Sequence, residues 1–256
     1  MAIPKIIHYC WFGGNPLPAS AVKCINSWKK FCPDYEIHLW NEENFDFNCN
    51  AYCAEMFRRK KWAFLTDYVR LKVVCDEGGV YLDTDVQLLK PLDPLLERGA
   101  FMGFECSDLV ATGLGFAAEA GHPFLRENMA FYENLQEFDS IPACPHITTE
   151  LLEAHGLVRD CSRTQTLAGM TIYGAEYLCP KNERTGLMTR TKNTVSIHHY
   201  DASWFEDDWI KWRNIRYRRA RLDYIIKTPN RILIRILGNE RYERLKKLLK
   251  RNHSQR

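Results

Sequence analysis

Hydrophobic and polar residues recur along the first part of the chain at two spacings, one typical of strands and one typical of helices. Residues 5–12 are rich in β-branched and aromatic side chains and stop at Gly13-Gly14, which predicts a buried strand ending in a glycine turn. Residues 35–40 alternate polar and apolar, as a second strand would. Between them, residues 19–31 can form a short helix.

A longer helix and further strands follow. Residues 62–77 place apolar side chains at helical spacing and end before Gly78-Gly79, which predicts a helix with a glycine C-cap. Residues 80–82 then form a short strand, and the other strand candidates are residues 100–105, 113–118 and 194–199. The pattern over residues 131–178 assigns no elements. The alternation of strands and helices predicts an α/β fold with a mixed, mostly parallel sheet and flanking helices.

Composition fits one sizeable globular domain, but the charge is divided unevenly. The 256 residues are 46% hydrophobic and 26% charged, with a net charge of +3. Residues 210–256 carry 16 Lys and Arg against 3 Asp and Glu, so the remaining 209 residues have 19 basic and 29 acidic side chains, a balance of −10. We therefore predict a catalytic domain over residues 1–209 and a basic, amphipathic helical tail over residues 210–256.

The chain has no run of about 18 apolar residues that would predict a membrane-spanning helix. Its first residues lack the basic start, apolar stretch and cleavage site of a signal peptide. We therefore expect a cytoplasmic protein whose 10 cysteines are reduced. The cysteines show no paired CxxC arrangement that would predict a zinc site.

Two aspartates at the end of a strand carry the strongest chemical signal, in the sequence Gly78-Gly79-Val80-Tyr81-Leu82-Asp83-Thr84-Asp85. Residues two apart in an extended chain point to the same face, so Asp83 and Asp85 project together. Converging carboxylates repel unless a cation joins them, and Mn²⁺ or Mg²⁺ is a natural partner for oxygen ligands. The simpler alternative is a pair of aspartates in an ordinary turn.

A second polar pair lies in the preceding helix. Asp67 and Arg70 are three residues apart and share a helix face with Phe64, Leu71 and Val74, so the pair should be partly buried. An intrahelical ion pair is the structural alternative. Because burying such a pair is costly, binding a sugar hydroxyl and a phosphate is a reason for it to exist.

A third group of polar residues lies near the end of the predicted domain. His198, His199, Ser203 and Trp204 supply imidazole, hydroxyl and indole N–H groups that can bind a metal or a leaving diphosphate. Trp11, at the end of the first strand, could stack on a nucleobase. Each of these residues taken alone has an ordinary structural explanation.

Together these motifs resemble glycosyltransferase family 32, which includes initiating mannosyltransferases of the yeast type and bacterial sugar transferases of capsular polysaccharide synthesis. The large clostridial glucosylating toxins are similar in arrangement. The resemblance covers residues 3–205 and is carried by Ile3-Pro4-Lys5-Ile6-Ile7-His8, Trp11-Phe12-Gly13-Gly14, Thr66-Asp67-x-x-Arg70, the motif at residues 78–85, His198-His199 and Ser203-Trp204.

The resemblance implies a GT-A-like, Rossmann-type fold, a divalent metal, typically Mn²⁺, and retention of anomeric configuration. The implied metal residues are Asp83, Asp85, His198, His199 and Ser203, with His198 favoured over His199. The implied donor-binding residues are Trp11, Phe12, Asp67, Arg70, Tyr81, Asp83, Ser203 and Trp204. The implied catalytic residues are Asp67, Arg70, Asp83, Asp85 and Trp204. One departure is Thr112-Gly113, where many relatives have Asn before the glycine.

We therefore expect transfer of a hexose from a nucleotide sugar, a UDP-sugar before GDP-mannose, to a surface glycan or lipid-linked oligosaccharide. No carboxylate in the sequence identifies itself as the base for inversion, which agrees with retention. One alternative is a haloacid-dehalogenase-like phosphatase with Asp83 as nucleophile, although that motif belongs near an N-terminus. Another is a binding protein acting through the basic tail, with an anionic membrane favoured over nucleic acid. The tail would then hold the protein at the inner face of the cell membrane. The structural alternative for the tail is a solvated helix that packs on the domain.

Overall fold

A computed structural model describes residues 2–201, 207–238, 241 and 243. The chain divides into two compact units. The first consists of Met1–Glu183 and Met188–Trp204, and the second of Arg184–Leu187 and Phe205–Arg256.

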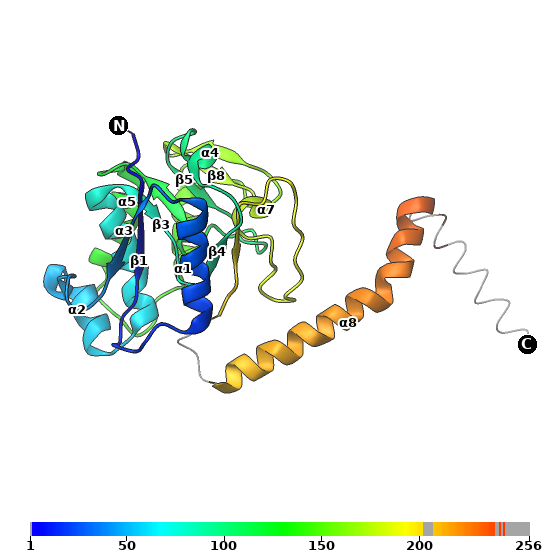
Figure 1. Ribbon diagram of the computed structural model, residues 1–256, viewed down its shortest axis with the longest axis horizontal. Coiled ribbons are helices and arrows are strands. Elements are labelled where there is room, and N and C mark those ends of the chain that lie inside the picture. The colour runs from blue at the N-terminus through cyan, green and yellow to red at the C-terminus, as the bar shows by residue number, and fades with distance from the viewer. Residues whose placement is uncertain (1, 202–206, 239–240, 242, 244–256) are drawn as a thin grey trace, which may run out of the picture. The chain divides into compact units, whose positions relative to one another are not determined.

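A seven-stranded sheet forms the centre of the first unit, in the order β2-β1-β3-β6-β5-β8-β7 (Figure 1). The strands are β1 Ile6–Cys10, β2 Glu36–Trp40, β3 Gly79–Tyr81, β5 Phe101–Gly103, β6 Phe116–Ala118, β7 Gln165–Leu167 and β8 Met170–Tyr173. Strand β1 pairs in parallel with β2 and β3, and β5 with β8, whereas β6 runs antiparallel to β3 and β5, and β7 to β8. A second sheet of two antiparallel strands joins β4, Val86–Leu88, to β9, Ser196–His198.

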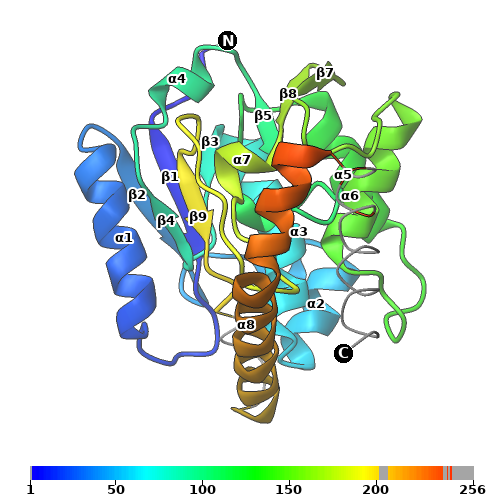
Figure 2. The same ribbon diagram turned by 90° about the vertical axis from the view of Figure 1, so that its right-hand side faces the viewer.

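Helices cover both faces of the seven-stranded sheet, and Figure 2 shows α1 on one side of the strands and α5 and α6 on the other. The helices of this unit are α1 Ala19–Phe31, α2 Ala51–Arg58, α3 Trp62–Glu77, α4 Asp93–Leu96, α5 Pro123–Glu133, α6 Cys144–Ala154 and α7 Ala175–Leu178, with short 3₁₀ helices η1 Phe47–Cys49 and η2 Thr112–Leu114. The predicted α/β fold with a mixed sheet and flanking helices is confirmed.

Alternating side chains of the strands divide the apolar core into two clusters. On β3, Val80 packs into the cluster that contains Trp28 of α1, while the next residue, Tyr81, packs into the cluster of α2, α3, α5 and α6. Strand β6 does the same with Ala117 on one face and Phe116 on the other. Both faces are buried, so the central strands consist mainly of apolar residues, with His8 of β1 as a buried polar exception.

Two consecutive glycines connect α3 to β3, as the sequence predicts. Gly78 ends the helix with φ +72°, and its N–H donates to the carbonyl of Val74 at 2.8 Å. A Cβ on Gly79 would lie 2.8 Å from the carbonyl oxygen of Ile6 and 3.0 Å from Nε2 of His8. Glycine is therefore needed where β3 begins to pair with β1.

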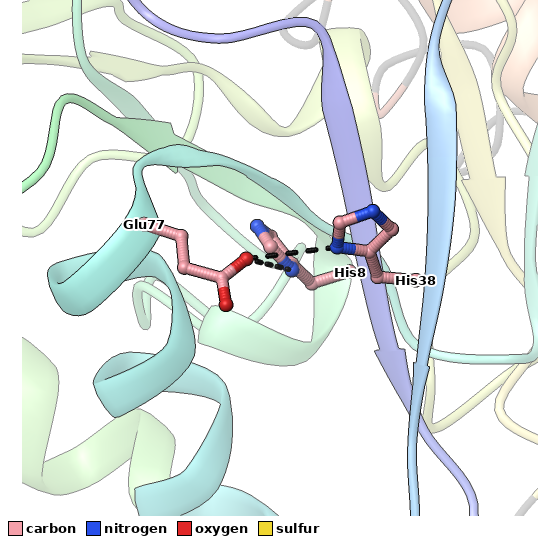
Figure 3. Close-up of side chains that lie close together, drawn as sticks. All are labelled: His8, His38 and Glu77. Atoms are coloured by element: carbon pink, nitrogen blue, oxygen red, sulfur yellow. Dashed lines mark ion pairs between the residues drawn. The ribbon is translucent and has the colours of Figure 1, made fainter. Parts of the chain in front are cut away.

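The buried side chain of His8 fixes this junction (Figure 3). Its Nε2 contacts the carbonyl of Gly78 at 2.8 Å, so Nε2 carries the proton, and Nδ1 accepts a hydrogen bond from Nε1 of Trp40 at 3.1 Å. Glu77 reaches toward Nδ1 of both His8 and His38, at 4.0 and 3.6 Å. Three such side chains could hold a metal ion. Because both nitrogens of His8 already have partners, we assign the cluster a structural role.

We expect a His8→Gln substitution to lower the free energy of unfolding by about 1–3 kcal/mol at neutral pH, since Trp40 loses a buried acceptor. This deficit should shrink as the pH falls toward about 5. Burial lowers the pKa of His8, so the unfolded wild-type chain takes up the proton first and the wild type alone loses stability on acidification. Urea unfolding at several pH values measures the difference. A deficit independent of pH would contradict a neutral, buried His8, and His38→Gln is the half-exposed control.

The second unit contains one long helix, α8, which runs from Asp207 to Leu237 (Figure 1). Among the helices of the described residues, none combines the length and apolarity needed to cross a membrane.

Candidate active site

The DxD aspartates occupy the turn between the two sheets. Asp83 and Asp85 follow β3, and the N–H of Val86, the first residue of β4, donates to the carbonyl of Asp83 at 2.9 Å. Their side chains are 25% and 15% exposed, so both are accessible but largely surrounded by protein. As the sequence predicts, the two carboxylates come together at a strand end.

The last residue of β9 and the residues that follow it contact Asp85. Nε2 of His198 lies 3.1 Å from one carboxylate oxygen of Asp85, and the backbone N–H of Asp201 donates to the other at 2.8 Å. The N–H of His199 donates to the carbonyl of Asp85 at 3.0 Å. Strand pairing of β4 with β9, which sets Val86 opposite His198, brings these distant residues to the aspartate.

Arg70 joins the helix pair to the DxD motif. Its Nη2 lies 2.9 Å from Oδ1 of Asp67, and its Nη1 lies 3.7 Å from Oδ2 of Asp83. The Arg70 guanidinium is also 5.4 Å from the centre of the Tyr81 ring and donates to Oγ1 of Thr112 at 3.3 Å. The pair is therefore more than an isolated ion pair on one helix.

Asp83 is held by Tyr81 and crowded by Gly113. The Tyr81 hydroxyl donates to Oδ1 of Asp83 at 2.8 Å. A Cβ on Gly113 would stand 2.4 Å from Oδ2 of Asp83 and 3.0 Å from Nη1 of Arg70. Only a residue without a side chain lets η2 approach the carboxylate this closely.

The electrostatics of the site combine burial with unequal charge. Burial raises the pKa of Asp67 to about 6 and also raises that of Asp83, with Arg70 opposing both shifts. Burial would raise the pKa of Asp85 as well, but the charge and hydrogen bond of His198 and the N–H of Asp201 lower it to about 2. Burial disfavours the imidazolium of His198, yet Asp85 raises its pKa well above 6.5. Three carboxylates thus face two cations, Arg70 and His198.

The chemistry of this donor set fits a divalent cation. One ligand atom each from Asp83, Asp85 and His198 lie within 4.8 Å of one another. The surplus negative charge favours a cation, and an imidazole that gives up its proton becomes a neutral ligand. Within the described part of the chain, Nδ1 of His198 is buried without a hydrogen-bond partner.

The other predicted site residues lie in varied surroundings. Nε1 of Trp11 donates to the carbonyl of Asn15 at 2.6 Å, and the Trp11 ring is partly exposed. Phe12 is buried against Phe47, with ring centres 5.8 Å apart, and Nε2 of His199 contacts Gln87 at 3.0 Å rather than the aspartates. Ser203 and Trp204 lie outside the described residues.

Three residues that the sequence did not suggest also surround the site. The Thr112 hydroxyl, which accepts a hydrogen bond from Arg70, lies 3.7 Å from Sγ of Cys144. Tyr200 has φ +56°, and its ring centre lies 4.2 Å from that of His198. Burial raises the pKa of Glu105, and the charge of His198 opposes that shift. No motif marks these residues. Only the position of Tyr200, directly after His198-His199, pointed toward the site.

Residues 18–102 match the model of one protein family. That family is described as the glycosyltransferase sugar-binding region containing a DXD motif. This region includes Asp67, Arg70, Asp83 and Asp85. Residues 18–102 are therefore similar to the sugar-binding region of DXD glycosyltransferases. The match confirms the predicted glycosyltransferase resemblance and favours it over the phosphatase alternative.

Two curated relatives are mannosyltransferases by name. Inositol phosphoceramide mannosyltransferase 3 of Schizosaccharomyces pombe is 33% identical over 152 residues, 57% of this chain and 41% of that protein. Inositol phosphoceramide mannosyltransferase 1 of the same organism is 28% identical over 148 residues, 54% of this chain and 44% of that protein. The chain therefore spans less than half the length of these relatives.

Two solved structures are similar at low identity. The PaToxG glycosyltransferase has a TM-score of 0.47 and 20% identity, covering 59% of this chain and 69% of its own. A glycosyltransferase involved in glycosylation of the major capsid of PBCV-1 has a TM-score of 0.45 and 14% identity, covering 86% of this chain and 100% of its own.

We expect a Gly113→Ala substitution to weaken Mn²⁺ binding at least about tenfold while the chain stays folded. The added methyl group must displace the carboxylate of Asp83 or the guanidinium of Arg70. Calorimetric titration with Mn²⁺ measures the affinity, and circular dichroism checks the fold. Gly156→Ala serves as a control, since a Cβ there meets no atom within 4 Å. An unchanged Mn²⁺ affinity in Gly113→Ala would contradict the expectation that the close approach of Gly113 to Asp83 is needed for metal binding.

Proposed function

We propose that this chain is a retaining, metal-dependent glycosyltransferase that moves a hexose from a nucleotide sugar. The observation that carries the proposal is the convergence of Asp83, Asp85 and His198 beside the Asp67–Arg70 pair. This arrangement offers a cation site beside a buried ion pair. The carboxylate of that pair is suited to bind sugar hydroxyls, and its guanidinium is suited to bind phosphate. The matched sugar-binding region covers four of these five residues.

Asp83, Asp85 and His198 would hold Mn²⁺ or Mg²⁺, with Ser203 as a further ligand. A bound divalent cation would neutralise charge that grows on the departing nucleoside diphosphate. Arg70 points its guanidinium between Asp67 and Asp83, where it can bind donor phosphate or sugar oxygens. Trp11 would stack on the nucleobase, and Trp204 would donate to the diphosphate.

The names of the relatives support a choice of donors and acceptors to test. We favour a UDP-sugar, and the mannosyltransferase names of the relatives support testing GDP-mannose beside it. Those names also mention a ceramide lipid, which supports a lipid-linked acceptor as an alternative to a growing capsular or other surface glycan.

Incubation with UDP-galactose, UDP-glucose, UDP-N-acetylhexosamines and GDP-mannose tests this function through release of nucleoside diphosphate. We expect slow hydrolysis of one donor with Mn²⁺, loss of release with EDTA, and loss of most turnover in Asp85→Asn. Near-normal turnover in that variant would contradict the metal assignment. Neither hydrolysis nor Mn²⁺-dependent nucleotide binding for any donor would contradict the transferase function.

We also propose that the C-terminal tail, residues 210–256, binds an anionic membrane surface, such as the inner face of the cell membrane. Trp212, Ile215, Leu222 and Ile226 of α8 are exposed and recur at spacings that place them on one helix face. Leu222 is 60% exposed and Ile226 73%, unusually high for large apolar side chains. The same stretch of α8 contains arginines at 213, 216, 218, 219 and 221, and basic helices with exposed apolar side chains lie on anionic membrane surfaces.

Replacing Leu222 and Ile226 together by Glu should reduce co-sedimentation with phosphatidylserine vesicles several-fold. Both an apolar contact and attraction to anionic lipid are lost. Asn214→Glu with Thr228→Glu changes the charge equally away from the apolar face and should retain more binding. An equal loss of vesicle binding in both double variants would indicate attraction by charge alone, the kind of attraction that nucleic acid would also exert. If the wild type does not bind the vesicles, the membrane role is contradicted.

A further inference from the structure

An uncommon backbone conformation marks the turn after β9. Tyr200 has φ +56°, in the left-handed region that residues with a Cβ rarely adopt. Such a conformation persists only where the surrounding structure holds it, and it is found most often at functional sites. Glycine adopts it without strain, so a tyrosine here indicates that the side chain supplies something that glycine could not.

The backbone on either side of Tyr200 contacts Asp85. The N–H of His199 donates to the carbonyl of Asp85 at 3.0 Å, and the N–H of Asp201 donates to its carboxylate at 2.8 Å. Tyr200 is the residue between these two donors, so its φ and ψ set the direction of the second N–H relative to the first. The left-handed conformation is therefore part of the way in which the chain turns around the aspartate.

The side chain of Tyr200 contacts both the end of α7 and His198. Its hydroxyl lies 3.0 Å from Sγ of Cys179, a fully buried residue directly after α7. Its ring centre lies 4.2 Å from the centre of the His198 imidazole, with the two ring planes at 59°. Nζ of Lys181 lies 5.9 Å from the centre of the same tyrosine ring. The ring thus connects a buried anchor to the imidazole that faces Asp85.

His198 needs such a contact because a hydrogen bond fixes its ring on one side only. Nε2 lies 3.1 Å from Asp85, whereas Nδ1 is buried and has no hydrogen-bond partner in the described part of the chain. A metal-binding histidine ordinarily donates its second nitrogen to a carboxylate or a carbonyl, which fixes the orientation of the ring. Packing against Tyr200 can supply that restraint instead.

We propose that Tyr200 is a positioning residue for the divalent cation, and that its ring holds the His198 imidazole with Nε2 directed toward Asp85. The inference rests on the proposed function, in which Asp83, Asp85 and His198 are the ligands of the cation. Without the tyrosine ring, the imidazole can rotate about its side-chain bonds and withdraw its nitrogen from the two carboxylates. Loss of the ring should therefore weaken cation binding and remove the nitrogen ligand.

The test uses Mn²⁺ alone, with its affinity measured by calorimetry and its histidine ligand detected as nitrogen modulation in pulsed electron paramagnetic resonance. We expect Tyr200→Gly to weaken Mn²⁺ binding about tenfold, a loss typical of residues that orient a metal ligand, and to abolish the nitrogen modulation. Tyr200→Asn also lacks the ring and tolerates the left-handed backbone, so it should behave in the same way. Tyr200→Phe keeps the ring contact and should stay within about threefold of the wild type, with the modulation retained.

Two further variants serve as controls, and circular dichroism checks that each variant folds. His198→Ala should abolish the nitrogen modulation, which assigns the signal to this imidazole and not to His199. Ala168→Gly is the matched backbone control, because Ala168 has φ +51° in the turn between β7 and β8, at the edge of the sheet. It changes a comparable backbone conformation away from the DxD turn and should leave Mn²⁺ binding unchanged.

Wild-type affinity in both variants without a ring would overturn the proposal, and so would weakened affinity with the nitrogen modulation retained, since the imidazole would then still be in place. Tyr200→Phe as weak as Tyr200→Gly would also overturn it, because the hydroxyl and not the ring would be the cause. A wild type that binds Mn²⁺ without nitrogen modulation would overturn the proposal and leave the proposed function standing. A wild type that binds no Mn²⁺ would instead contradict the cation site of the proposed function itself.

Discussion

Surplus negative charge in a largely enclosed turn is the constraint on which the rest of this site depends. Among the described residues, the ion pairs of Asp67, Asp83 and Asp85 are with Arg70 and His198, and each carboxylate has lost much of its water. Charges removed from water are stable only when paired and hydrogen-bonded. The Tyr81 hydroxyl and the Asp201 N–H supply such bonds to Asp83 and Asp85, and the remaining imbalance favours a divalent cation.

The scaffold brings these charges together from distant parts of the chain. The glycine junction after α3 lets β3 pair beside β1, which aims the DxD turn past the carboxyl end of the strand. The short β4–β9 sheet then carries His198 and the following turn back to Asp85. Tyr200 adopts a left-handed backbone conformation in that turn, an uncommon one for a tyrosine, which its ring contact with His198 and its hydroxyl contact with Cys179 help to hold.

Local patterns predicted the local elements well. The helices at residues 19–31 and 62–77 have the predicted bounds, and the glycines after the second helix cap it as expected. The convergence of Asp83 with Asp85 followed from the two-residue period of a strand. Residues 131–178 were not assigned, and the contacts of Cys144 with Thr112, 32 residues away, and of His198 with Asp85 depend on tertiary packing. The sequence marked His198 through a motif but contained no comparable signal for Cys144 or Glu105.

Calorimetric binding of a nucleoside diphosphate, with and without Mn²⁺, tests the central claim most directly. The account predicts tight binding to the wild type only when Mn²⁺ is present, and loss of this Mn²⁺ dependence in both Asp85→Asn and His198→Ala. Equal affinity with and without the metal in the wild type would contradict a cation held by Asp83, Asp85 and His198.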